Sequence, residues 1–179
     1  PQLLGAIAAG GEGEALLGDM ILAFGVCARE AREKGISVED HATHLVVEAD
    51  AVVEKPASIS WEEAAGIGVP FVTAMEGLRR AGMPKAGESV LVMGVNGKVG
   101  QAAVQIATWH GARAIGVVRK SEAYEGHSNS PVEVIDASTT DVATRVRELT
   151  SGKGADIVYN TVGDPYFQAA HKSLALRGR

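Results

Sequence analysis

The chain has 179 residues, of which 46% are hydrophobic, and a formal net charge of -5 at pH 7. This length supports one domain with an appendage and is short for two full domains. The acidic balance with dispersed lysines and arginines argues against a nucleic-acid partner. One cysteine, Cys27, excludes a disulfide framework, and no apolar run reaches the ~20 residues of a membrane span, so we expect a cytoplasmic protein without a membrane partner.

Residues 1–55 predict a small α/β appendage that is partly loop. The helical evidence is the pair Glu30 and Lys34, four residues apart, and a capping-box pattern that opens at Ser37. The expected elements are a loop at 1–15, a strand at 16–23, a helix at 26–34, a helix from 37 and a strand at 50–55.

Two helices are predicted at the start of the second domain, which we place at residues 56–179. Ser60 and Glu63 form another capping box, which begins a helix that runs through Ile67. A proline suits the first turn of a helix but not its interior. We therefore expect Pro70 to introduce a separate helix over residues 71–81.

From residue 89 short apolar runs alternate with helical segments, which is typical of a parallel sheet covered by helices on both faces. Right-handed crossovers then give the strand order 3-2-1-4. We predict an α/β fold, a Rossmann-like doubly wound parallel sheet. The strands are expected at 89–93, 114–118, 132–135 and 156–160, and the helices at 98–110, 121–126, 141–150 and 166–174.

The sequence stops at Arg179, directly after the last predicted helix, whereas a doubly wound sheet normally continues with further strands. We expect the sheet to be truncated on this side and the edge at residues 156–160 to be unpaired. An unpaired edge can pair with another chain, so it predicts a homo-oligomer formed through that edge.

The most informative stretch contains Gly94, Gly97 and Gly100, spaced three apart between an apolar strand and a helix. Glycines at this spacing make a tight turn, let the backbone approach a ligand and bring the helix close to its strand. The helix start offers free N–H groups and a positive dipole end to an anion. The stretch predicts a pyrophosphate-binding turn, and a plain structural turn is the alternative.

The second predicted strand runs into Arg119, Lys120 and Ser121. In this fold an acidic residue there binds the ribose 2'-hydroxyl of NAD, whereas an arginine nearby accommodates a 2'-phosphate. We therefore predict NADP(H) as the cofactor, with Arg119 as a bidentate partner and Lys120 as a point charge. The alternative is a solvated basic pair at a strand end.

Six stretches are specific in combination: SWEEAA at 60–65, PFVTA at 70–74, GESVLV at 87–92, VGQA at 99–102, GKGADIV at 152–158 and NTVG at 160–163. With them the sequence from about residue 49 resembles the quinone-reductase and enoyl-reductase branch of the medium-chain dehydrogenase/reductase family. The resemblance implies a reductase without catalytic zinc, in which NADPH supplies hydride to a quinone or an activated carbon-carbon double bond.

The resemblance also implies a place for each candidate cofactor-binding residue. Thr73 lies near the nicotinamide, the turn around Asn96 holds the pyrophosphate, Arg119 meets the 2'-phosphate, and residues 160–163 flank the nicotinamide ribose. No catalytic acid or base is identified, and no metal ligand. The candidate cofactor-binding residues are Thr73, Gly94, Asn96, Gly97, Lys98, Val99, Gly100, Arg119, Lys120, Asn160, Thr161, Val162 and Gly163.

The N-terminal part departs from that family, whose substrate domain has a counterpart only near residues 46–56. The runs LLGDMIL, AREAREKG and DHATHLVV, within residues 16–47, instead resemble a fragment of the bacterial zinc-dependent rRNA-maturation endoribonucleases. The metal-binding His-Gly-x-x-His run of that family is replaced by residues 48–50, so the chain resembles a junction of two families. His41 and His44 have no third ligand in view and predict an ordinary helix rather than a metal site.

Three functions follow from these patterns. The first is an NADPH-dependent quinone or enoyl reductase domain. The second is a non-catalytic nucleotide-binding or chimeric structural module that lacks a substrate domain. The third, a metal-dependent ribonuclease, is disfavoured by the missing histidines and by the acidic balance.

Overall fold

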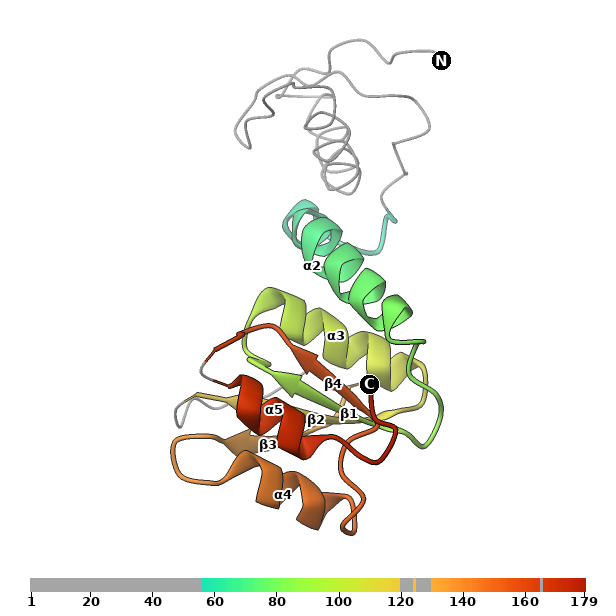
Figure 1. Cartoon of the computed structure of the whole chain (residues 1–179). Helices are drawn as coiled ribbons and strands as arrows, with labels where there is room; N and C mark the ends of the chain where they lie inside the picture. The colour runs from blue at the N-terminus through green and yellow to red at the C-terminus, as the bar shows by residue number, and fades with distance from the viewer. Residues whose placement is uncertain (1–55, 120–123, 125–129, 165) are drawn as a thin grey trace, which may run out of the picture. The chain divides into compact units, whose positions relative to one another are not determined.

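The computed structural model describes residues 56–119, 124, 130–164 and 166–179 (Figure 1). The elements predicted within residues 1–55 lie outside the described residues, and only residue 124 of the helix predicted at 121–126 is described. Contacts divide the chain into two units, Pro1–Val72 and Thr73–Arg179, and the division falls inside a helix. The predicted domain boundary after residue 55 stays a prediction.

A four-stranded parallel sheet forms the centre of the second unit, in the order β3-β2-β1-β4, as the sequence predicts (Figure 1). Apolar β-branched and leucine side chains dominate β1, which pairs on both sides and is buried along its whole length. In register, Leu91 of β1 faces Ile115 of β2 and Val158 of β4. The strands are β1 (Ser89–Met93), β2 (Arg113–Val118), β3 (Val132–Asp136) and β4 (Ile157–Asn160).

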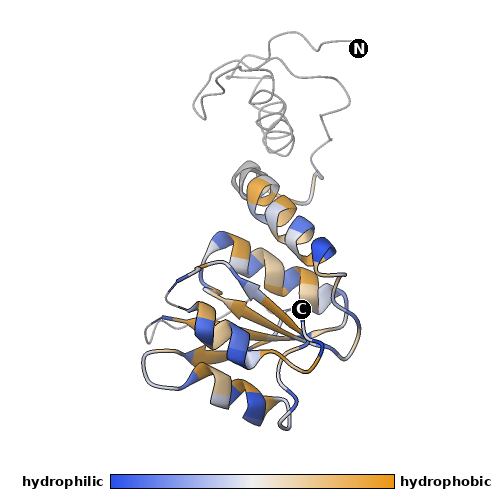
Figure 2. Cartoon of the chain, in the orientation of Figure 1, coloured by the Kyte–Doolittle hydropathy of each residue, from blue (hydrophilic) through white to orange (hydrophobic). Residues whose placement is uncertain are grey.

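Helices cover the two faces of this sheet. Figure 1 shows α3 (Lys98–Trp109) on one face and α4 (Val142–Leu149) and α5 (Phe167–Ser173) on the other. Because side chains alternate along a strand, Leu91 and Met93 of β1 point to the α4 and α5 face, where they join a buried cluster with Val146 of α4. Figure 2 shows the result as apolar strands between helices with hydrophilic outer faces.

The helix before the sheet, α2 (Trp61–Arg80), corrects one prediction. Its capping box is confirmed, because the Ser60 N–H donates to Glu63 Oε2 at 2.7 Å and the Glu63 N–H donates to Ser60 Oγ at 3.1 Å. Pro70, however, lies inside one continuous helix of 20 residues and does not begin a new one. A proline inside a helix removes the hydrogen bond to the carbonyl four residues earlier, here that of Gly66, and its ring crowds that carbonyl. The helix nevertheless continues through Pro70 to Arg80. No helix of the described part of the chain is both long and apolar enough to cross a membrane.

The outer edge of β4 corrects a second prediction. The Val158 N–H donates to the Arg179 carbonyl at 2.9 Å, and the Arg179 N–H donates to the Asp156 carbonyl at 3.0 Å. The chain therefore returns after α5 and pairs with its own edge, through a turn in which Arg177 has a φ of 67°. The expectation of an unpaired edge is wrong at Asp156 and Val158, and association through this edge stays an untested prediction.

The Arg179 side chain joins the same edge to the loop between α2 and β1. Its guanidinium donates to the carbonyls of Ala81 and Met83 and to both carboxylate oxygens of Glu88, at 3.1 and 2.9 Å. The hydrogen bond with Arg179 lowers the pKa of Glu88 below its ordinary value of 4.5. Arg179 therefore links the last residues of the second unit to the loop before β1, and we call this set of contacts the Arg179 clamp.

We expect Arg179→Met to lower the free energy of unfolding by about 1–2 kcal/mol at neutral pH, because charge-assisted hydrogen bonds are lost. A carboxyl with a lowered folded pKa stabilises the fold above its ordinary pKa and loses that contribution as pH falls through the folded value. The difference between the two proteins should therefore shrink below pH 4.5. Urea unfolding followed by circular dichroism at neutral and acidic pH measures it. Arg145→Met, which breaks only an exposed pair with Glu148, is the control, and a pH-independent difference would contradict the clamp.

Candidate functional site

The carboxyl ends of β1, β2 and β4 meet at one edge of the sheet, and the glycine turn lies there. Gly94 follows β1 with a φ of 74°, a conformation that favours glycine. The N–H groups of Gly94 and Val95 both donate to the Val117 carbonyl, at 3.0 and 3.1 Å. The start of the turn is thus bonded to the end of β2, where the predicted cofactor selectivity residues follow.

The other two glycines bring α3 against the end of β1. The Gly97 N–H donates to the Gly94 carbonyl at 3.0 Å. A Cβ atom on Gly100 would lie 2.5 Å from that same carbonyl oxygen, which leaves no room for any side chain. The helix can therefore approach the end of β1 closely because Gly100 has no side chain to collide with the Gly94 carbonyl.

Among the described residues, no side chain caps the N-terminus of α3. Gly97 is the N-cap residue, it makes no side-chain cap hydrogen bond, and the first turn carries no acidic residue. By contrast, α4 begins with Asp141, whose carboxylate accepts a hydrogen bond from the Thr144 N–H at 2.8 Å. The N–H groups of the first α3 turn have no intrahelical acceptor, so this end of the helix suits an anion. Lys98, exposed at the first position of the helix, adds a positive charge beside it.

The loop after β4 is tied to the same place. The Thr161 hydroxyl donates to the Met93 carbonyl at 2.7 Å. The side-chain oxygen of Asn160 accepts hydrogen bonds from the N–H groups of Val162 and Gly163, at 3.0 Å each. A Cβ atom on Gly94 would lie 2.6 Å from a Val162 methyl, so the loop packs directly on the glycine turn. The side chains of Asn160 and Thr161 therefore fix the shape of this loop.

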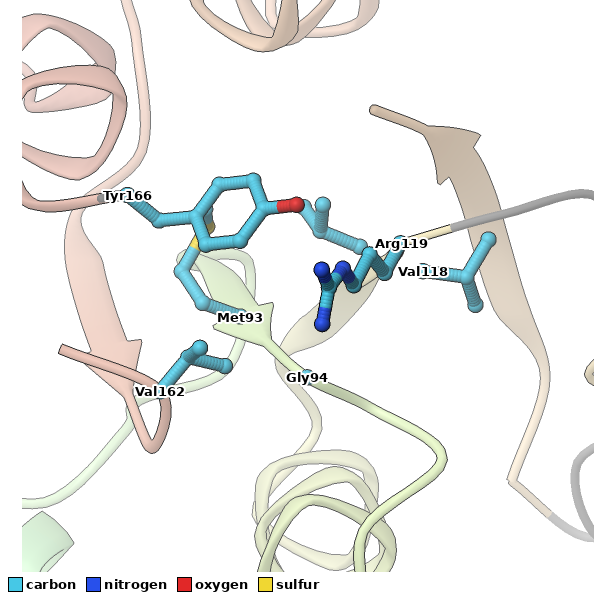
Figure 3. Close-up of a pocket in the computed structure, with 7 residues that line it drawn as sticks. Met93, Gly94, Val118, Arg119, Val162 and Tyr166 are labelled. Carbon is cyan, nitrogen blue, oxygen red and sulfur yellow. The ribbon is translucent and has the colours of Figure 1, made fainter. Parts of the chain in front are cut away.

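A cavity of about 100 Å³ opens between these strand ends (Figure 3). Its walls are mostly apolar, and Arg119 is the charged residue that borders it. In Figure 3 the Tyr166 ring lies beside Met93, with its hydroxyl directed toward the end of β2. The lining residues are Met93, Gly94, Val117, Val118, Arg119, Val162 and Tyr166.

Two further candidate residues are Thr73 and Lys120. Thr73 has an exposed side chain on α2, and its backbone carbonyl accepts a hydrogen bond from the Tyr159 hydroxyl at 3.1 Å. Lys120 lies outside the described residues, as do His41 and His44. Among the residues that are described, no group of three or more His, Cys, Asp or Glu side chains could hold a metal ion.

Sequence reasoning did not identify Tyr166 or Met93 as residues of this site. The available signal was topological, because Met93 ends one parallel strand and Tyr166 precedes the helix that follows another. Both therefore had to lie at the carboxyl edge of the sheet. Which of them borders a cavity depends on side-chain packing, which the sequence pattern does not give.

Comparisons with known proteins agree with this geometry. Residues 99–179 match a family model described as zinc-binding dehydrogenase. A phenolphthiocerol/phthiocerol polyketide synthase of Mycobacterium tuberculosis is 38% identical over 138 residues, which are 76% of this chain and 6% of the synthase. The chain thus spans a small part of this relative.

Two solved reductase structures are similar to this chain over the same share of its length. The crystal structure of the enoyl reductase CurK has a TM-score of 0.69 and 32% identity, over 76% of this chain and 41% of that one. The quinone oxidoreductase of Escherichia coli, solved in complex with NADPH, has a TM-score of 0.67 and 30% identity, over 76% of this chain and 42% of that one. This chain is therefore similar to about two-fifths of each structure.

We expect Gly100→Ala to lower the free energy of unfolding by about 2 kcal/mol, because the added methyl meets the Gly94 carbonyl oxygen at 2.5 Å. The matched control is Gly97→Ala, whose methyl would lie 3.3 Å from the same oxygen at an ordinary φ of -70°. That control should cost less than about 1 kcal/mol. Urea unfolding followed by circular dichroism measures both, and equal losses would contradict the close-approach argument.

Proposed function

The described domain belongs to the medium-chain dehydrogenase/reductase family, as a quinone reductase-like and enoyl reductase-like oxidoreductase domain, and on this premise we propose that it binds NADP(H) at the glycine turn. The observation that carries the proposal is the uncapped start of α3, placed by a glycine turn at the edge where the four parallel strands end. A diphosphate is the part of a dinucleotide that such a helix end binds best.

In this proposal residues 94–100 hold the pyrophosphate. The backbone N–H groups of Lys98, Val99 and Gly100 would donate to its oxygens, and Asn96 lies in the turn that leads to them. The Lys98 ammonium would add a charge partner. A lysine at a helix N-terminus opposes the helix dipole, so a bound anion would offset an unfavourable interaction as well as make new ones.

Arg119 is proposed to select the 2'-phosphate of NADP(H). Its guanidinium is exposed at the end of β2 and borders the cavity, and no carboxylate of the described residues forms an ion pair with it. A guanidinium can bind a phosphate through two parallel hydrogen bonds. Lys120, the next residue in the sequence, is proposed as a second positive charge on the same group.

The nicotinamide is proposed to lie between Thr73 and residues 160–163. When bound, the cofactor supplies a hydride, and the protein's part is to bind and orient it. The substrate class, a quinone or an activated carbon-carbon double bond, is likewise a proposal taken from the similar proteins, of which this chain spans about two-fifths or less. No residue of this chain is assigned as an acid or base.

Isothermal titration calorimetry with NADPH and NADH tests the cofactor assignment. We expect Arg119→Ala to weaken NADPH binding about thirtyfold and NADH binding less than about twofold, because only NADPH carries the 2'-phosphate. Arg145→Ala removes the same charge from the exposed surface of α4 and should change neither. Equal affinity of the original protein for both cofactors, or an unchanged NADPH affinity in Arg119→Ala, would show that the assignment is wrong.

Oxidation of NADPH in the presence of 1,2-naphthoquinone, followed by absorbance, tests the activity. Saturable turnover supports a reductase, because the domain then holds both reactants. Binding of NADPH without turnover supports the alternative of a non-catalytic nucleotide-binding module. A protein that neither binds nor oxidises NADPH refutes the proposed function.

A further inference from the structure

Tyr159 connects two segments that the proposed function places on either side of the nicotinamide. It lies in β4, in register with Val92 of the central strand. Its hydroxyl donates to the Thr73 carbonyl at 3.1 Å, across 86 positions of sequence. The next residue, Asn160, begins the loop that packs on the glycine turn.

The ring of Tyr159 occupies a place on α2 that only a glycine leaves open. A Cβ atom on Gly77 would lie 2.5 Å from Cε2 of the ring and 2.6 Å from its hydroxyl oxygen. Thr73 and Gly77 are one helical turn apart, so ring and hydroxyl contact successive turns of the same helix face. The position of this turn of α2 is therefore fixed by one side chain of the sheet.

The Tyr159 hydroxyl can donate this hydrogen bond only while it is protonated. Burial raises the pKa of Tyr159 above its ordinary value of 10. The group is accordingly neutral and a hydrogen-bond donor throughout the physiological range. Its partner, a backbone carbonyl, does not titrate, so the contact is insensitive to pH near neutrality.

We propose that Tyr159 is a positioning residue for the nicotinamide end of the cofactor, acting through Thr73. The end of β4 would then position both sides of the nicotinamide site. Tyr159 holds the helix that carries Thr73 on one side, and Asn160 and its neighbours form the loop on the other side. This inference rests on the proposed function. Loss of a positioning residue weakens binding of the nicotinamide half of the cofactor only, whereas loss of a generally stabilising residue affects binding of both halves.

The test compares NADPH with adenosine 2',5'-bisphosphate, which carries the 2'-phosphate and no nicotinamide. In Tyr159→Phe the ring remains against Gly77 and only the hydrogen bond is lost. We expect the bisphosphate to bind as in the original protein by calorimetry, and NADPH to bind about fivefold more weakly. The change in nicotinamide fluorescence on binding should decrease by about half or more, because a loosely held ring remains closer to its state in water.

A second pair of variants tests the same contact from the helix. Gly77→Ala pushes the Tyr159 ring away and should reproduce the selective loss of nicotinamide fluorescence. Gly66→Ala, in the same helix, is the matched control, because nothing among the described residues lies within 4 Å of the added methyl. It should leave both ligands and the fluorescence unchanged.

Every outcome of these experiments either supports or overturns the inference about Tyr159. Unchanged NADPH binding and fluorescence in Tyr159→Phe overturn the inference, and so does an equal loss of both ligands together with a lower melting temperature, which indicates a structural role. An original protein that binds NADPH without any change in nicotinamide emission overturns the inference while cofactor binding stands. If the original protein binds neither ligand, the proposed function itself fails.

Discussion

The contact between the first turn of α3 and the carbonyl of Gly94 determines the geometry of the candidate site. Because Gly100 has no side chain, the helix can start directly against the end of the central strand, and its free N–H groups point to the sheet edge. Any larger residue would move the helix away from that edge. The strand order then matters, since β1 has a neighbour on each side and both neighbours end at the same place. This close approach of two backbone segments therefore places the positive end of α3 beside the carboxyl ends of the strands.

The glycine turn and the loop after β4 are held by the protein's own hydrogen bonds. The Thr161 hydroxyl bonds to the end of β1, and the Asn160 side chain closes its own turn, so the loop after β4 is shaped without a ligand. Binding to such a site loses little conformational entropy, which favours affinity. The cavity beside Arg119 and Tyr166 is part of the same arrangement, because its walls are the ends of β1 and β2 and the loop after β4.

Local patterns predicted most of the fold, and long-range contacts account for what they missed. The four strands and the Ser60–Glu63 capping box could be predicted because they depend on periodicity or on residues three apart. The strand order could be predicted because crossovers between parallel strands are right-handed. The continuity of α2 through Pro70 could not, because the other hydrogen bonds of this helix keep it intact where the proline removes one. The paired edge at Val158 depends on Arg179, and the Tyr159 contact spans 86 positions. No spacing rule reports on such pairs, and the predicted binding roles await ligand measurements.

The lysine that opens α3 has a thermodynamic consequence for anyone who handles the protein. A positive side chain beside an uncapped positive helix end is a local electrostatic conflict, and solutes that relieve it bind the native state in preference to the unfolded chain. By mass action, each such solute raises the apparent melting point in proportion to the logarithm of its concentration once it exceeds its dissociation constant. On the proposed function, phosphate in the buffer would act as such a solute and an amine buffer would not, so the two buffers would give different apparent melting points.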